Sequence, residues 1–338
     1  MAAYIIRRLI SGFILIVLMS LVTFLLFFAS PVDEAKQACG KNCTPVQIEQ
    51  TRQALGYDEP VIAQWVDFLK GVVAGRSYPN DPELAKTAPE TIAECPAPCL
   101  GYSRFSQDTV TNLIQDALPI SLSLAVLAFV MWISGGIVFG VIAALRKGTI
   151  IDRGIVGVSL LFFAFPTFFT GLFLYQFIAI KWQLVPIPAY TSIADGGVAT
   201  WLAGLMLPSL TLALFYMAGY VRMTRAFVLE SMGEDYLRTA RAKGLVSRKV
   251  LVKHSLRGAL TPLVTMAGLD FASLVGGAII TEQVFNYPGL GKLAVDAAYN
   301  LDLPLTVGIV LLLATFVIIA NIIVDVLYAF IDPRVKVG

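Results

Sequence analysis

The stretch LPISLSLAVLAFVMWISGGIVFGVIAAL, residues 118–145, contains 28 residues and no charged side chain. The hydrocarbon core of a bilayer is about 30 Å thick, so a helix needs about 20 predominantly apolar residues to cross it. This stretch is long enough to cross with tilt or with one end outside the membrane. It therefore predicts a transmembrane helix.

The composition of the whole chain agrees with a membrane protein. Hydrophobic residues make up 57% of the 338 residues, charged residues only 14%, and the mean hydropathy is +0.76. A soluble domain has roughly 25% charged residues, and a net charge of +2 argues against a nucleic-acid-binding protein. We expect an all-α integral membrane protein with six transmembrane helices. They are predicted at residues 9–30, 118–145, 154–180, 201–221, 260–281 and 303–331.

Two prolines fall inside predicted spans beyond the first helical turn, and a pair of glycines is spaced for helix contact. Pro166 and Pro208 are expected to kink their helices, because proline removes one hydrogen bond of the helical ladder. Gly136 and Gly140 form a G-x-x-x-G pattern, which permits close helix contact but indicates no particular function.

The basic residues predict the orientation of the chain. The loop 222–258 contains nine Lys and Arg residues, whereas the two short loops on the other side contain only Lys181 and Lys292. Basic loops stay in the cytoplasm. In a chain of six spans, the loop between the fourth and fifth lies on the same side as both termini, so both termini are expected in the cytoplasm. The first apolar run is longer than a signal-peptide core and no A-x-A site follows it, so we interpret it as a span.

The chain divides into three parts on this interpretation. Residues 1–30 form the N-terminal tip and first span, residues 31–116 an extracytoplasmic cap, and residues 117–338 a five-helix core that includes the loop 222–258.

The cap is expected to be partly helical and partly irregular. TPVQ at 44–47 is a capping box with proline at the first helical position, and its helix should end at Gly56. A second helix with an apolar stripe should run from Pro60 to Gly75, packed on the outer ends of the spans or lying in the membrane interface. Residues 77–105 are rich in proline and polar residues and predict an irregular loop.

All four cysteines lie in this outer region. An even number of cysteines on the oxidising side favours disulfides, and three pairings are possible. The competing interpretation is a four-thiolate zinc site, which the missing C-x₂-C spacing disfavours. The candidate residues are Cys39, Cys43, Cys95 and Cys99.

The most informative segment is ESMGEDYLRTARAKG, residues 230–244. Gly233 can end the fourth span, and Glu234 and Asp235 then begin a short helix that ends near Lys243, as the helix dipole prefers. Gly244 follows at a position that often adopts a left-handed conformation, and a second short helix is expected over residues 247–256. Two such helices are too small to have a core of their own, so we expect them to dock on another protein.

This segment resembles the coupling loop of ABC importer permeases, whose pattern is E-A-A, three residues and then glycine. Residues 238–240, 241–243 and Gly244 occupy those places. Arginine replaces the motif glutamate at 238, and Arg257 stands where many importers have proline. The wording DYLRTARAKG at 235–244 is similar to the B-type permeases of dipeptide and oligopeptide importers. Further stretches of similarity are residues 4–9, 55–60, 284–291 and 324–334.

The resemblance implies the type I ABC importer permease fold in a bacterial inner membrane. It also implies a heterodimer with a paralogous permease, two ATPase subunits that carry ATP and magnesium, and an external peptide-binding protein. No Walker A pattern occurs in the chain, so a non-catalytic subunit without its own cofactor is expected. The residues implied in coupling to the ATPase are Glu234, Asp235, Leu237, Arg238, Thr239, Ala240, Arg241, Lys243 and Gly244.

Three polar residues inside the predicted spans are candidates for a functional or structural role. Asp270 is near the middle of the fifth, where a carboxylate costs roughly 2.5–3.5 kcal/mol on insertion scales. It is a candidate for the translocation path, with a structural hydrogen bond as the alternative. Asn321 and Asp325 lie one helical turn apart and are expected to form a polar clamp between helices.

Other classes of protein stay open as alternatives. A secondary transporter or channel predicts paired intramembrane charges or inverted repeats with broken helices, and neither pattern is clear. A membrane-embedded enzyme requires a nucleophile, base or metal cluster, and the predicted spans contain no histidine or cysteine. A permease for nickel or another small solute is the third alternative.

Overall fold

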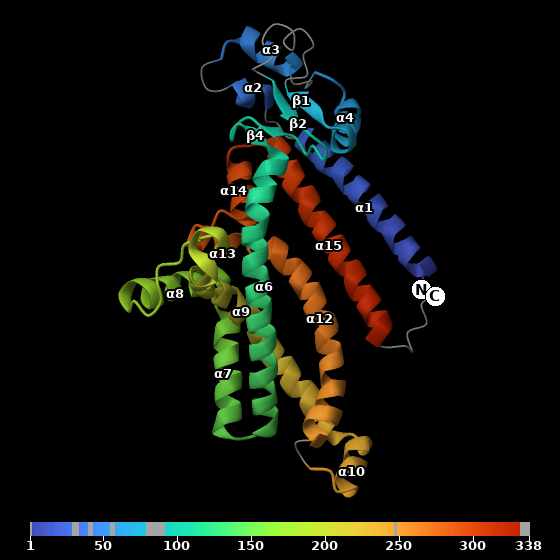
Figure 1. Cartoon of the computed structure of the whole chain (residues 1–338), viewed down its shortest axis with the longest axis vertical. Coiled ribbons are helices and arrows are strands. Elements are labelled where there is room, and N and C mark those ends of the chain that lie inside the picture. The colour runs from blue at the N-terminus through green and yellow to red at the C-terminus, as the bar shows by residue number, and fades with distance from the viewer. Residues whose placement is uncertain are drawn as a thin grey trace. The chain divides into compact units, whose positions relative to one another are not determined.

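The structure of the chain is a computed structural model, and it describes residues 2–28, 34–39, 43–54, 58–78, 92–246 and 249–331. The chain folds into two compact units. Unit 1 is Met1–Pro119 with Gly289–Ile319, and unit 2 is Ile120–Pro288 with Ala320–Gly338. Two long helices, α6 (Val110–Leu145) and α15 (Leu303–Ile331), contribute residues to both units (Figure 1).

The helical membrane-protein class is confirmed, whereas the number of spans stays a prediction. In the part of the chain that the structure describes, four helices are long and apolar enough to cross a membrane. They are Ile6–Leu26, Val110–Leu145, Ile193–Gly233 and Leu303–Ile323. A bent pair, Ile150–Ala164 with Thr167–Lys181, makes a fifth span if it is counted as one. The helix α12 (Leu256–Gly277), which covers most of the predicted fifth span, is not among them.

In unit 1, the helix α1 (Ala2–Phe28) packs against α4 (Val61–Ala74). The rings of Phe24 and Phe68 lie 5.1 Å apart, and the Trp65 indole N–H donates to the Ser20 hydroxyl at 2.9 Å. Side chains from the start of α15 complete this apolar cluster. The amphipathic helix therefore packs on spanning helices, which is the first of the two arrangements that its stripe allowed.

Phe68→Ala is expected to lower the free energy of unfolding of unit 1 by about 3–5 kcal/mol, because Phe68 is only 3% exposed and a cavity would remain. Tryptophan fluorescence during denaturation of the detergent-solubilised protein reports the change, since Trp65 lies in the same cluster. The control is Val73→Ala on the same helix, whose side chain is 81% exposed. Equal stability of the two variants would show that the α1–α4 contact adds nothing.

The irregular loop predicted for residues 77–105 is wrong at residues 77–78, 93–95 and 102–103, which form short strands, whereas residues 96–101 and 104–105 are irregular as expected. Strand β1 (Arg76–Tyr78) pairs antiparallel with β2 (Ala93–Cys95), and β3 (Tyr102–Ser103) pairs with β4 (Asp108–Thr109). Residues 79–91 lie outside the described part. Strands of two or three residues are too short to produce a visible alternation of polar and apolar side chains.

The helical part of the cap agrees with the sequence signals. The helix α3 (Pro45–Ala54) begins with the expected capping box: the Gln47 N–H donates to the Thr44 hydroxyl at 3.3 Å, and the Thr44 N–H donates to the Gln47 side-chain carbonyl at 2.9 Å. Its predicted end at Gly56 lies outside the described residues. A short helix, α2 (Glu34–Cys39), precedes it and packs against it.

The four cysteines form two local disulfides. Cys39 bonds to Cys43, and Cys95 bonds to Cys99. Of the three possible pairings, the structure thus has the one that closes two small loops and does not link the two cap segments.

The rest of unit 1 joins the beginning of α6 to α14 (Leu290–Tyr299) and α15 through a buried apolar cluster. Gly308 lets two of these helices approach closely, because a Cβ there would overlap a Val110 methyl carbon. The buried Asp302 carboxylate accepts a hydrogen bond from the Ser103 hydroxyl, which ties the β3–β4 hairpin to the start of α15.

Unit 2 is organised around α9 (Ile193–Gly233), which packs against α7 (Ile150–Ala164) and α12. The two glycines of the G-x-x-x-G pattern contact α9, as expected. A Cβ on Gly136 would lie 2.5 Å from the Tyr220 Cβ, and one on Gly140 would lie 2.5 Å from the Thr224 Cβ. Close packing of α6 against α9 therefore depends on these glycines.

Pro166 breaks the third predicted span and does not merely kink it. The helix α7 ends at Ala164, and α8 (Thr167–Leu174) with the π-helix η2 (Tyr175–Lys181) continues at an angle of 105°. Phe165 is extended, as residues before proline usually are. By contrast, α9 continues through Pro208, and its non-helical residue is Gly197.

Candidate functional site

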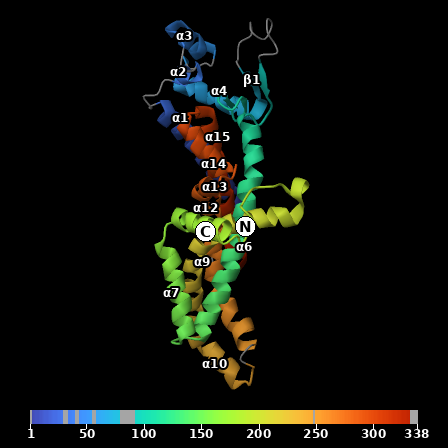
Figure 2. The same ribbon diagram turned by 90° about the vertical axis from the view of Figure 1, so that its left-hand side faces the viewer.

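The loop predicted at residues 222–258 begins as a helix. Because α9 continues to Gly233, Arg222 and Arg225 lie on its last turns and not in a loop. The short helix α10 (Asp235–Ala242) follows after Glu234, as the sequence predicted, and Gly244 is left-handed with φ 77°. Figures 1 and 2 place α10 at the same end of unit 2 as the turn between α6 and α7.

The second short helix expected at residues 247–256 is not a separate element. Residues 247–248 lie outside the described part, and the chain is helical from Lys249. The π-helix η3 (Val250–Ser255) then continues directly into α12. No glycine or proline interrupts residues 249–257, and the helix also continues through Gly258 into α12.

The segment around α10 has a small core, contrary to the expectation from its size. Leu237 is fully buried and contacts Ala240 and Val250, with Leu245 packed beside them. The turn after α10 is closed by a hydrogen bond from the Leu245 N–H to the Ala240 carbonyl at 3.3 Å. Neither α10 nor η3 is large enough for a core alone, and this core forms because the turn after α10 brings Val250 against Leu237.

Polar contacts join α10 to the ends of its two neighbours. The Ser231 hydroxyl at the end of α9 donates to the Ser255 carbonyl of η3 at 3.1 Å and lies 3.2 Å from the Tyr236 hydroxyl of α10. Three elements therefore meet at one buried serine. A force on α10 has a direct route into α9 and into the helix that becomes α12.

The opposite face of α10 is exposed. The side chains of Asp235 and Arg238 are 96% and 74% exposed and form an ion pair at 3.5 Å. Tyr236 is 48% exposed, and the side chain of Arg241 lies outside the described part. The remaining exposed residues here are Glu234, Thr239, Ala242, Lys243, Gly244 and Val246. A helix with one anchored apolar edge and one mixed polar face is suited to docking on a protein.

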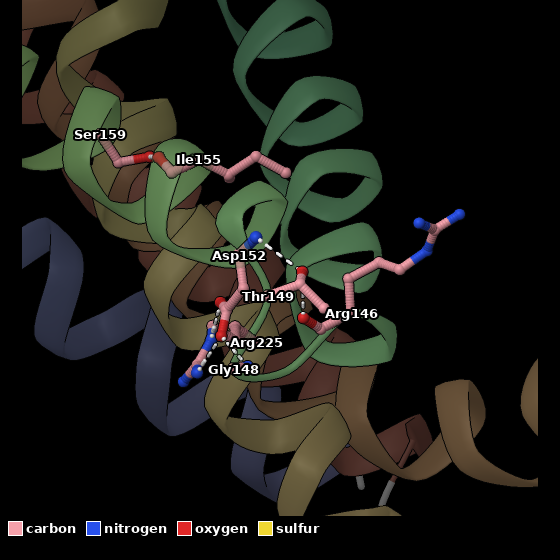
Figure 3. A network of polar contacts seen from close by, with 7 residues as sticks. All are labelled: Arg146, Gly148, Thr149, Asp152, Ile155, Ser159 and Arg225. Carbon is pink, nitrogen blue, oxygen red and sulfur yellow. Dashed lines mark hydrogen bonds and ion pairs between the residues drawn. The ribbon is translucent and has the colours of Figure 1, made fainter.

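A buried ion pair lies at the same end of unit 2, and the sequence analysis did not find it. Arg225 of α9 binds the Asp152 carboxylate of α7 with two parallel hydrogen bonds, at 2.7 Å from Nε and 2.8 Å from Nη2 (Figure 3). The Asp152 side chain is 5% exposed and that of Arg225 is 28% exposed. Two-pronged pairing fixes orientation as well as distance, so the pair holds α7 against α9 in one arrangement.

The first turn of α7 prepares the carboxylate for this contact. Thr149 caps the helix by accepting a hydrogen bond from the Asp152 N–H at 3.4 Å, and its hydroxyl donates to the Arg146 carbonyl at 2.6 Å. The Gly148 N–H donates to the Asp152 carboxylate at 2.9 Å (Figure 3). The Thr149-x-x-Asp152 spacing is a helix-start signal that could have drawn attention to Asp152, but its partner is 73 residues away.

Asp270 receives a hydrogen bond from the Tyr220 hydroxyl of α9 at 2.6 Å. Aromatic rings pack beside Tyr220: the Trp132 ring lies 6.2 Å from the Tyr220 ring and stacks on Tyr216 at 4.6 Å between centroids. The hydrogen bond agrees with the structural alternative for Asp270, and it leaves a role in translocation open.

The predicted clamp of Asn321 and Asp325 stays a prediction. Both residues lie on α15, one turn apart, but the Asp325 side chain lies outside the described part.

Two protein families together match nearly the whole chain. Residues 136–337 match the family described as binding-protein-dependent transport system inner membrane component, and residues 1–125 match the N-terminal family of the same membrane components.

Full-length relatives are found among bacterial transport proteins. The chain is 35% identical to the probable peptide ABC transporter permease protein y4tP of Sinorhizobium fredii, over 99% of this chain and 100% of the relative. It is 32% identical to the dipeptide transport system permease protein DppB of Escherichia coli, over 99% of both chains.

Among solved structures, the fold is similar to a chain of the inward-facing MetNI methionine ABC transporter. The TM-score is 0.53 with 18% identity, covering 65% of this chain and 96% of that chain. This similarity concerns the fold alone, and it agrees with the type I permease architecture expected from the sequence.

Proposed function

The chain belongs to the family of binding-protein-dependent transport system inner membrane components, and from this we propose that it is a transmembrane permease subunit of an ATP-driven peptide importer. The peptide substrate is inferred from the printed names of full-length relatives at 32–35% identity. The observation that carries the coupling role is α10, which is anchored to α9 and η3 on one side and exposed on the other.

The proposed mechanism uses α10 as a rigid lever. Closure of two ATPase subunits around ATP pushes the exposed face of α10. The contacts of Ser231 and Leu237 transmit this displacement to α9 and η3, and η3 is continuous with α12. Alternating access requires an assembly with two discrete packings, and ATP biases one of them.

The proposed assembly has four kinds of partner, in line with the family. These are a paralogous permease, two ATP-binding-cassette subunits, an external peptide-binding protein and the lipid bilayer. Hydrolysis of ATP with magnesium takes place on the ATPase subunits, so this chain itself is non-catalytic. The basic residues near α10 and near the α6–α7 turn support a cytoplasmic location of that end and of both termini in the plasma membrane.

Purification of the tagged chain in mild detergent, followed by mass spectrometry, tests the assembly. We expect a second permease and Walker A ATPases to copurify, and the reconstituted complex to accumulate a labelled dipeptide only with ATP and binding protein. A chain that purifies alone as a stable homodimer would instead favour a secondary transporter.

Site-directed photocrosslinking tests the docking face of α10. A cysteine-reactive photoprobe at Lys243→Cys is expected to label an ATPase subunit in the purified complex. The matched control is Val73→Cys on α4, which is 81% exposed and should label no ATPase. All four native cysteines are in disulfides, so they do not compete for the probe. Labelling of lipid alone from Lys243→Cys would contradict the docking role.

A further inference from the structure

The carboxylate of Asp270 lies near the middle of α12, the helix that covers most of the predicted fifth span. It is the one acidic residue of α12, fourteen residues after Leu256. Its partner Tyr220 lies thirteen residues before the end of α9 at Gly233. At 1.5 Å per residue, both lie about 20 Å from the α10 end of their helices. In a hydrocarbon core about 30 Å thick, this places the pair deep in the membrane.

No basic side chain in the described part of the chain forms an ion pair with this carboxylate. The Tyr220 hydroxyl donates to one oxygen, and no hydrogen bond to the other oxygen is found among the described residues. Of the nearest arginines along α9, Arg225 binds Asp152. The Arg222 guanidinium lies 4.7 Å from the centre of the Phe163 ring, and its Nε has no hydrogen-bond partner among the described residues. A negative charge at this depth is stabilised by a cation, and the described part of the chain supplies none.

Aromatic side chains pack around Tyr220, the residue that donates to this carboxylate. Trp132 is fully buried, and its indole is in contact with the rings of Tyr216, Tyr220 and Phe129. Its N–H has no hydrogen-bond partner among the described residues. Asp270 and Tyr216 are partly exposed, so the cluster is open on that side. A carboxylate beside aromatic faces is the combination that binds organic ammonium groups, through charge attraction and cation–π contact.

We propose that Asp270, oriented by Tyr220, with the rings of Tyr216 and Trp132 packed beside that tyrosine, binds the α-ammonium group of the peptide during its passage. This inference rests on the proposed function. The chemistry favours an organic cation over a metal ion, because the site offers one carboxylate and one phenol beside aromatic rings, and no group of three or more His, Cys, Asp or Glu side chains that could hold a metal ion is found among the described residues. The free amino terminus of a peptide, with a pKa of about 7.7–8.0, is mostly protonated at pH 7.

The test compares a labelled dipeptide with its N-acetylated form, which has no positive charge at that end. Saturation-transfer NMR measures their binding to the purified complex without the binding protein, so that selection by that protein does not contribute. In the wild-type complex the free dipeptide should bind about tenfold more tightly than the acetylated one. A ratio of one would overturn the proposal.

Variants of the site separate the ammonium role from a structural one. Asp270→Asn should lose about tenfold in affinity for the free dipeptide and leave the acetylated dipeptide unchanged. Tyr220→Phe, which removes only the orienting hydroxyl, should lose about threefold. The matched control is Ser273→Ala on the exposed part of the same helix, whose hydroxyl donates to the Leu269 carbonyl. It should behave as wild type.

The remaining outcomes distinguish a failure of the ammonium site from a failure of the proposed function. Equal affinity of Asp270→Asn and wild type for the free dipeptide would show that Asp270 is structural. If the Asp270→Asn complex does not assemble, Asp270→Glu, which keeps the charge, takes its place as the variant. The ratio of the wild-type affinities for the free and the acetylated dipeptide then decides the proposal alone. Absence of any dipeptide accumulation by the wild-type complex, with its binding protein and ATP, would refute the proposed function itself. Normal accumulation with a ratio of one would refute only the ammonium site.

Discussion

Gly244→Pro is expected to reduce ATP-driven peptide uptake about a hundredfold or more, while insertion and assembly persist. Gly244 has φ 77°, whereas proline fixes φ near −65°. The substitution must therefore open the turn that the Leu245–Ala240 hydrogen bond closes, and Leu237 loses the packing of Leu245. An α10 that is no longer anchored cannot transmit displacement to α9 and η3.

Proteoliposomes containing the complete importer measure the effect. ATP hydrolysis by Gly244→Pro should continue at its basal rate and lose its stimulation by peptide-loaded binding protein. The control is Gly244→Asn, because asparagine tolerates the left-handed conformation and a Cβ at this position meets no atom within 4 Å. It should transport at close to the wild-type rate. Normal uptake by Gly244→Pro would refute the lever.

Arg225→Ala is expected to reduce coupled uptake by about tenfold or more and to lower the thermal stability of the complex. The substitution leaves the Asp152 carboxylate, which is 5% exposed, without its charged partner, and an unpaired buried charge is strongly destabilising. The contact that orients α7 on α9 is lost at the end of unit 2 where α10 lies. Arg225→Lys keeps the charge without the two-pronged geometry and should recover only part of the activity.

A surface ion pair of the same length serves as the control for this prediction. Lys70 and Asp67 on α4 lie 2.7 Å apart, with side chains 70% and 51% exposed. Exposed pairs contribute about 0–1 kcal/mol, so Lys70→Ala should leave both uptake and thermal stability unchanged. If Arg225→Ala behaves like Lys70→Ala, the buried pair does not position α7 for coupling.

Gly244→Pro and Arg225→Ala both disturb the packing around α10 and α9, but they break different contacts. Gly244 acts on the turn that closes α10 against η3, and Arg225 acts on the packing of α7 beside α9. The double variant therefore helps to interpret the single ones. If both residues serve one lever, Arg225→Ala should add little to the transport defect of Gly244→Pro, because coupled sites are not additive.

Local signals in the sequence were enough to predict several elements of the fold. The capping box at Thr44 and Gln47 and the left-handed Gly244 depend on neighbours within a few residues along the chain. The apolar stretches depend only on the thickness of the bilayer, which is the same for every helix that crosses it. The motif at residues 235–244 indicated the family, and the comparisons confirmed it.

Contacts between distant segments were decided by the tertiary structure alone. Arg225 meets Asp152 across 73 residues, and Tyr220 meets Asp270 across 50. No local sequence pattern shows which faces of α7, α9 and α12 pack together. The 105° break at Pro166 likewise required the structure, because a proline inside an apolar run is compatible with a kink, a break or a continuous helix. Hydropathy and helix-end signals act over a few turns, whereas side-chain partners are chosen by the packing of whole helices.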